Sequence, residues 1–165
     1  MKRVAVLGST GSIGTNALDV IASHPDRLQL VGIAARSRIE LLAAQIHRYQ
    51  PTLAAVLAED RAAQLRAQCG ETVEVFEGVE GFIRLATHPN VDVVLIGTSG
   101  REALVPLVRA IEAGKHIALA SKELLVMAGE LIMRVVQEHQ GTLIPVDSEH
   151  AAVFAREIEV RHAAE

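Results

Sequence analysis

The chain carries the stretch Gly8-Ser9-Thr10-Gly11-Ser12-Ile13-Gly14, a glycine-rich turn that follows a short apolar run over residues 3–7. Apolar residues recur at helical spacing in the segment that the turn opens: Ile13, Ala17, Val20 and Ile21. A strand, a glycine-rich turn and a helix in this order are the context that a dinucleotide-binding loop requires. Residues 3–23 therefore predict a βα unit with a phosphate-binding turn.

Each glycine of the turn has a distinct expected role. Gly8 can adopt a backbone conformation closed to other residues, Gly11 lacks the Cβ that would block a pyrophosphate, and Gly14 lets helix and strand pack closely. We expect the N–H groups of Gly11, Ser12 and Ile13 to face the anion at the positive end of the helix. The spacing differs from G-x-G-x-x-G, because two residues precede the second glycine. The alternative is a turn without a ligand, but three glycines at one junction are costly unless the backbone must approach something.

The end of the second expected strand indicates which cofactor the turn serves. NAD-binding domains carry an Asp or Glu there for the ribose, whereas an Arg accommodates the 2′-phosphate of NADP. This chain has Arg36-Ser37-Arg38 and no acid before Glu40. Two guanidinium groups on either side of a hydroxyl suit a phosphate, so NADPH is favoured. The alternative is a pair of solvated arginines at a helix start.

The remainder of the chain alternates short β-rich runs with longer helical patterns. The expected strands cover residues 3–7, 28–35, 53–57, 72–76, 91–97, 116–120 and 142–146. The expected helices cover residues 12–23, 38–49, 60–68, 78–86, 102–113, 129–139 and 151–165. This alternation predicts an α/β fold of the Rossmann type, a doubly wound and mostly parallel sheet with helices on both faces. We expect one NADPH-binding domain over residues 1–150, and a helix over 151–165 that begins a further, catalytic domain.

Composition narrows the function. The 165 residues carry a net charge of −4 with acids and bases mixed, so no basic stripe suits nucleic acid or anionic lipid, and a small-molecule partner is favoured. No signal-peptide pattern and no apolar run of roughly 20 residues is present, which favours a cytoplasmic protein without membrane spans. Cys69 is the only cysteine, so neither an internal disulfide nor a thiolate metal cage can form.

Three later segments follow expected strands, at the edge where ligands bind in open α/β sheets. They are Gly97-Thr98-Ser99-Gly100, Ala120-Ser121-Lys122-Glu123 and Val146-Asp147-Ser148-Glu149-His150. Asp147 and Glu149 are two residues apart, so a turn could direct both carboxylates at one hard ion such as Mg²⁺ or Mn²⁺. Ser148 could donate to a substrate oxygen or phosphate. The alternative is that Asp147 or Ser148 only caps the last helix.

Taken together, these motifs resemble the 1-deoxy-D-xylulose 5-phosphate reductoisomerase family. GSTGSIG after the first strand, A-S-K-E after a middle strand and P-V-D-S-E-H after a late strand occur in the family in this order and spacing. The resemblance runs from residue 1 to about residue 155. Departures from the family pattern are Ser121 for a usual Asn, Leu124 for a usual Ser, Ala151 for a usual Asn, and Arg36-Ser37-Arg38 for a Gly-Lys-Asn type of segment.

The resemblance implies an enzyme of the non-mevalonate isoprenoid pathway. Such an enzyme rearranges 1-deoxy-D-xylulose 5-phosphate and reduces the resulting aldehyde with NADPH, using a divalent ion as Lewis acid. It also implies a homodimer, and a catalytic domain that lies beyond this chain. By residue, the resemblance implies that Thr10, Gly11, Ser12 and Ile13 bind the cofactor phosphates and that Ser121 lies at the nicotinamide end. It implies that the catalytic residues are Lys122 and Ser148, which contact substrate, and Glu123, a substrate-side or supporting group. It implies that Asp147 and Glu149 are metal ligands.

Two other functions remain open from the residues alone. One is a different NADPH dehydrogenase of a small aldehyde, with Ser121 and Leu124 marking a changed substrate. The other is a non-catalytic nucleotide-binding module that keeps the cofactor loop.

Overall fold

The structure is a computed structural model that describes residues 1–98 and 100–146. These residues form one seven-stranded sheet in the order β4-β3-β2-β1-β5-β6-β7, in which all neighbouring strands are parallel. The strands are β1 (Lys2–Leu7), β2 (Leu28–Ala35), β3 (Leu53–Val56), β4 (Glu74–Glu77), β5 (Val93–Ile96), β6 (His116–Leu119) and β7 (Leu143–Pro145). The helices are α1 (Ser12–Ser23), α2 (Ile39–Tyr49), α3 (Ala62–Cys69), α4 (Gly78–Thr87), α5 (Leu104–Glu112) and α6 (Lys122–Glu138), with single 3₁₀ turns at Glu59–Arg61, Gly70–Thr72 and Arg101–Ala103.

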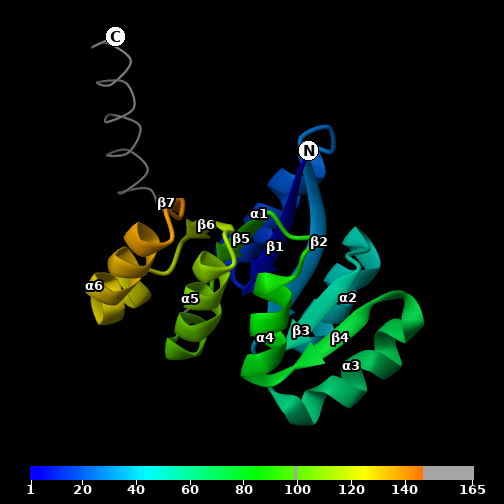
Figure 1. Ribbon diagram of the computed structural model, residues 1–165. Coiled ribbons are helices and arrows are strands. Elements are labelled where there is room, and N and C mark those ends of the chain that lie inside the picture. The colour runs from blue at the N-terminus through cyan, green and yellow to red at the C-terminus, as the bar shows by residue number, and fades with distance from the viewer. Residues whose placement is uncertain (99, 147–165) are drawn as a thin grey trace.

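Helices pack on both faces of the sheet (Figure 1). On one face Leu18 of α1, Leu42 of α2 and Leu65 of α3 are fully buried in a single hydrophobic cluster. On the other face Phe82 of α4 and Leu107 of α5 belong to a second cluster, which also includes Ile132 of α6. Two separate cores on a central parallel sheet are the signature of a doubly wound α/β fold. The expected fold class is confirmed.

The strand order reverses at β1, which lies between β2 and β5. Chain segments that leave the carboxyl ends of these strands diverge toward opposite faces, and ligands of open α/β sheets bind in the crevice that this leaves. The glycine turn leaves β1 at this point, which places residues 8–14 where a dinucleotide would bind.

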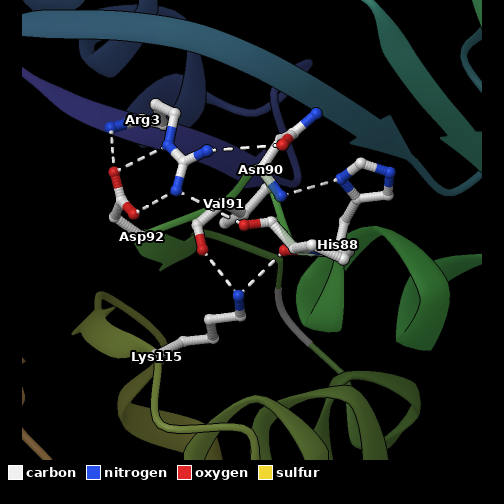
Figure 2. Close-up of polar contacts among 7 residues, drawn as sticks. Arg3, His88, Asn90, Val91, Asp92 and Lys115 are labelled. Atoms are coloured by element: carbon white, nitrogen blue, oxygen red, sulfur yellow. Dashed lines mark hydrogen bonds and ion pairs between the residues drawn. The ribbon is translucent and has the colours of Figure 1, made fainter.

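The opposite, amino-terminal edge of the sheet is held by a polar cluster (Figure 2). The Arg3 guanidinium contacts both carboxylate oxygens of Asp92, with Nη2 2.7 Å from Oδ1 and Nε 3.0 Å from Oδ2. The Lys115 ammonium donates to the carbonyl oxygens of His88 and Val91 at 2.8 and 2.7 Å. These bonds join the starts of β1, β5 and β6 far from the carboxyl edge, so we assign the cluster to stability.

Apart from shifts of one or two residues at the ends of several elements, two details differ from the sequence-based expectation. Helix α6 begins at Lys122 rather than at residue 129, and its only non-helical backbone angles lie at Ala128. In α1 the buried residues are Gly14, Leu18 and Ile21, while Ile13 and Val20 are exposed. The face of α1 that packs on the sheet is therefore rotated from the expected one. Ile13 and Val20 instead line an open apolar groove.

The helix expected over residues 151–165, and with it the domain boundary near residue 150, lies outside the described residues. In the part of the chain that is described, no helix is both long and apolar enough to cross a membrane.

Candidate nucleotide-binding site

The strand register brings the expected ligand-binding segments to one edge. At the carboxyl ends, Leu7 of β1 lies beside Ala34 of β2 and Ile96 of β5, and Ile96 lies beside Leu119 of β6. Backbone hydrogen bonds continue this row past the strand ends, from Gly8 to Ala34, from Gly97 to Leu7 and from Ala120 to Ile96. The glycine turn, the Gly97 segment and the Ala120 segment thus share the edge, as expected.

The glycines at the two ends of the turn are required by close contacts. Gly8 has φ of +90°, and a Cβ there would lie 2.6 Å from the backbone nitrogen of Thr98. A Cβ on Gly14 would collide with the carbonyl oxygen of Gly8 and lie 2.6 Å from the Cα of Ser9. Both expected roles, the special backbone conformation of Gly8 and the close helix packing at Gly14, are confirmed.

The donor assignment at Gly11 was wrong. The Gly11 N–H donates to the carbonyl oxygen of Gly8 at 3.1 Å, so it closes the turn instead of facing an anion. Gly11 is the N-cap of α1, and within the described residues no side chain caps this end and its first turn holds no acid. The positive end of a 12-residue helix is therefore free of a competing carboxylate, with Ser12 and Ile13 exposed at its start.

The back of the turn is fixed by a buried side chain that sequence reasoning missed. Gln45 of α2 is 5% exposed, and its amide nitrogen Nε2 donates to the carbonyl oxygen of Ser9 at 2.8 Å. The Ser9 hydroxyl is fully buried and donates to Gln45 Oε1 at 2.7 Å. A polar residue on the apolar stripe of α2, beside Leu42 and Ile46, is the signal that could have found it.

The basic segment after β2 contacts the turn and a second element. Arg38 Nη1 donates to the carbonyl oxygen of Thr10 at 2.9 Å. Arg36 Nη1 lies 3.3 Å from Oε1 of Glu102, a residue of the 3₁₀ turn before α5. Arg36, Ser37 and Arg38 are all exposed, and the Arg36 side chain retains 69% of its accessibility. The two guanidiniums are available to a phosphate, but each already has a partner within the protein.

Glu102 is the second residue that sequence reasoning missed. Its side chain is only 16% exposed, and Oε1 is buried without an aligned hydrogen bond among the described residues. The contact with Arg36 is therefore a charge pair and not a directed hydrogen bond. Because 66 residues separate the pair in sequence, no local pattern indicates it.

The Ala120 segment forms the start of α6. Ser121 is 4% exposed and is the N-cap of the helix, and its hydroxyl lies 3.2 Å from Glu123 Oε2. Lys122 and Glu123 are exposed in the first turn, at the end of β6. They lie two strands from the glycine turn, on the side of β1 opposite the arginines. This order fits a dinucleotide laid across the edge with its adenosine end over β2.

The expected metal ligands Asp147 and Glu149, and Ser148 between them, lie outside the described residues. Their last described neighbour, Val146, donates its N–H to the Leu119 carbonyl, so β7 leads to the same edge. In residues 1–98 and 100–146 no group of three or more His, Cys, Asp or Glu side chains could hold a metal ion.

The fold, the switch point and the glycine turn define a dinucleotide-binding domain of the Rossmann type. Comparisons with known proteins narrow this class: a family model described as 1-deoxy-D-xylulose 5-phosphate reductoisomerase matches residues 4–129. The chain belongs to this family.

Individual relatives point to the same family. The 1-deoxy-D-xylulose 5-phosphate reductoisomerase of Geotalea uraniireducens is 49% identical over 155 residues, covering 93% of this chain and 40% of the relative. The Zymomonas mobilis enzyme, solved in complex with NADPH, superposes with a TM-score of 0.85 at 36% identity, over 90% of this chain and 39% of that chain. A reductoisomerase solved with NADPH, fosmidomycin and magnesium gives a TM-score of 0.86 at 34% identity, over 99% of this chain and 43% of that chain. The chain thus spans about 40% of the length of the curated relatives it matches.

Proposed function

We propose that this chain is the NADPH-binding domain of a 1-deoxy-D-xylulose 5-phosphate reductoisomerase. The observation that carries the proposal is the carboxyl edge of the sheet, where the uncapped start of α1 follows a glycine turn and two exposed arginines follow β2. The family relation supports the same function, because the Zymomonas mobilis relative was solved with NADPH.

Different groups of the domain would bind different parts of the cofactor. The backbone N–H groups of Thr10, Ser12 and Ile13, at the positive end of α1, would hold the pyrophosphate. Arg36 and Arg38, with the Ser37 hydroxyl, would hold the 2′-phosphate, since no carboxylate follows β2 before Glu40 to favour a free ribose hydroxyl.

The nicotinamide end falls at β6. Ser121 lies at that end of the edge, and the exposed Lys122 ammonium and Glu123 carboxylate follow it at the start of α6. We propose that Lys122 contacts the substrate, because an ammonium beside a phosphorylated sugar stabilises the negative charge of that sugar. Glu123 is assigned a supporting role.

Asp147 and Glu149 are proposed as ligands of Mg²⁺ or Mn²⁺, with Ser148 contacting substrate. Carboxylate oxygens are the ligands that these ions prefer, and a family member was solved with magnesium. When bound, the ion supplies a Lewis acid for the carbon shift and NADPH supplies the hydride. A homodimer and a cytoplasmic location belong to the same proposal.

The test is NADPH oxidation in the presence of 1-deoxy-D-xylulose 5-phosphate and Mn²⁺, by this chain and by any longer product of the same gene. We expect no turnover by this chain alone, and, in a longer product that carries a catalytic domain, oxidation that depends on the sugar phosphate and is abolished by Asp147→Asn. Oxidation with another aldehyde only would identify a different dehydrogenase. NADPH binding without oxidation of any substrate by either protein would identify a nucleotide-binding module.

A further inference from the structure

Gln45 lies behind the glycine turn, and its side chain is hydrogen-bonded to Ser9 of that turn. It belongs to α2, between the buried side chains of Leu42 and Ile46, and is itself buried. A buried amide must satisfy its hydrogen bonds within the protein, and Gln45 does so on a single residue, Ser9 of the turn.

The orientation of the amide follows from its partners. A backbone carbonyl oxygen can only accept a hydrogen bond, so the group that faces Ser9 O must be the Gln45 NH₂. The amide oxygen then faces the Ser9 hydroxyl, which has to act as the donor. The 2.8 and 2.7 Å contacts therefore form a reciprocal pair with one arrangement of hydrogens.

This pair fixes the direction of one peptide group of the turn. The Ser9 carbonyl accepts a hydrogen bond from Gln45 Nε2 at 2.8 Å, so it is held on the protein side. The Thr15 hydroxyl lies 3.3 Å from the same carbonyl, but its nearer acceptor is the Gly11 carbonyl at 2.9 Å. The Ser9–Thr10 peptide is trans, and in a trans peptide the N–H points opposite to the C=O. The Thr10 N–H is therefore held away from Gln45, and among the described residues it donates to no protein group.

We propose that Gln45 is a positioning residue for the cofactor pyrophosphate: it presets the turn so that the Thr10 N–H is offered to the anion. This inference rests on the proposed binding of NADPH. It explains why a polar side chain occupies a core position of α2, since a preset donor needs no rearrangement when the charge arrives. By this proposal, loss of the Gln45 amide nitrogen weakens cofactor binding, whereas loss of the Ser9 hydroxyl does not.

The test compares three ligands on purified variants by calorimetry, together with the melting temperature of each protein. In Gln45→Met both hydrogen bonds are lost at similar side-chain length. We expect the Kd values for NADPH and NADH to rise by the same factor, about tenfold, the equivalent of one hydrogen bond to a charged group. The Kd for adenosine 2′-monophosphate should not change, because this ligand has the 2′-phosphate but no pyrophosphate.

Three further variants separate a positioning role from a purely structural one. Ser9→Ala keeps the bond from Gln45 Nε2 to the Ser9 carbonyl, so it should lower the melting temperature and leave both dinucleotide Kd values within about twofold. Ile46→Val removes a methyl group from the next residue of α2, a buried core side chain with no polar atoms, and should likewise lower the melting temperature with unchanged Kd values. Thr15→Val, at an exposed position, removes a hydroxyl whose nearer acceptor is the Gly11 carbonyl at 2.9 Å and which lies 3.3 Å from the Ser9 carbonyl, so it should weaken both dinucleotides by no more than about twofold.

Unchanged dinucleotide affinity in Gln45→Met would overturn the role of Gln45, as would an equal loss of adenosine 2′-monophosphate binding. If Gln45→Met does not fold, unchanged dinucleotide affinity in Gln45→Leu, which also lacks the amide donor, overturns it instead. Wild-type protein that binds neither dinucleotide would overturn the proposed function, and this inference with it.

Discussion

The Arg38 guanidinium donates a hydrogen bond to the backbone carbonyl of Thr10 at 2.9 Å, and this bond joins the basic segment after β2 to the glycine turn after β1. The two elements that would hold the two phosphate groups of NADPH are therefore connected before any ligand binds. Arg36 has no such link to the turn and is paired with Glu102 instead. The two arginines should consequently differ in what their removal does.

Arg36→Ala should reduce affinity for NADPH and leave affinity for NADH unchanged, because Arg36 serves only the 2′-phosphate. Loss of one charge-assisted contact costs about 1.5–3 kcal/mol, or at least tenfold in Kd. Arg38→Ala should weaken both cofactors, and NADPH more, since it also releases the Thr10 carbonyl. Titration of both variants with both cofactors measures this; unchanged discrimination in both would refute the assignment of the 2′-phosphate to these arginines.

Glu102→Gln should strengthen NADPH binding. The Glu102 carboxylate competes with the 2′-phosphate for Arg36, and the amide removes the competing charge at the same size. Because the Arg36 side chain is well exposed, the pair is screened and the gain should be modest, about two- to fivefold in Kd. NADH, which has no 2′-phosphate, is the control ligand and should bind as before. Weaker NADPH binding in this variant would mean that Glu102 orients Arg36 for the cofactor.

Gly14→Ala should destabilise the domain and abolish cofactor binding. The added methyl group meets backbone atoms of Gly8 and Ser9, which cannot move without displacing the turn, at a cost of about 1–3 kcal/mol. Gly129→Ala is the matched control, because a Cβ there meets nothing within 4 Å and alanine favours a helix by up to about 1 kcal/mol. Thermal melts and NADPH titration of both variants provide the measurement. Equal behaviour of the two would show that the turn tolerates a side chain at its last glycine.

The Arg3–Asp92 pair should make the stability of the fold depend on pH in the acid range. Hydrogen bonds from the Arg3 side chain and backbone hold the pKa of Asp92 well below its usual range. A carboxylate with a depressed pKa stabilises the fold above its unfolded pKa of about 4, and this contribution is lost as pH falls toward the folded pKa. Asp92→Asn should therefore melt at a lower temperature at neutral pH, and its melting temperature should fall less steeply than that of the wild type between about pH 5 and pH 2. Parallel curves for the two proteins would contradict the pairing, and NADPH affinity at neutral pH should be unaffected.

Much of this architecture could be predicted because its signals are local. The glycine turn requires particular residues at Gly8 and Gly14, and the alternation of strand and helix patterns requires a parallel sheet. Local signals also misled where the backbone departs from ideal geometry. Gly129 resembled a helix start, but it only follows the irregular Ala128 within a helix that begins at Lys122.

The hydrogen-bond partners inside the site could not be predicted, because they either join residues far apart in sequence or depend on the exact backbone conformation of the turn. Ser9 and Gln45 are 36 residues apart, and the turn's internal bond from Gly11 to Gly8 depends on a backbone conformation that residue types alone do not specify. The proposed roles of Asp147, Ser148 and Glu149 rest on their donor chemistry and on the family relation, since these residues lie beyond the described part of the chain.

We propose that the carboxyl edge of this sheet binds NADPH through the glycine turn and the arginines after β2. Calorimetric titration of the 165-residue chain with NADPH and, separately, with NADH tests it most directly. We expect one site for each cofactor, with NADPH bound at least about tenfold more tightly, as one extra charge-assisted contact requires. Equal affinity for the two cofactors, or no binding of either by the folded domain, would contradict it.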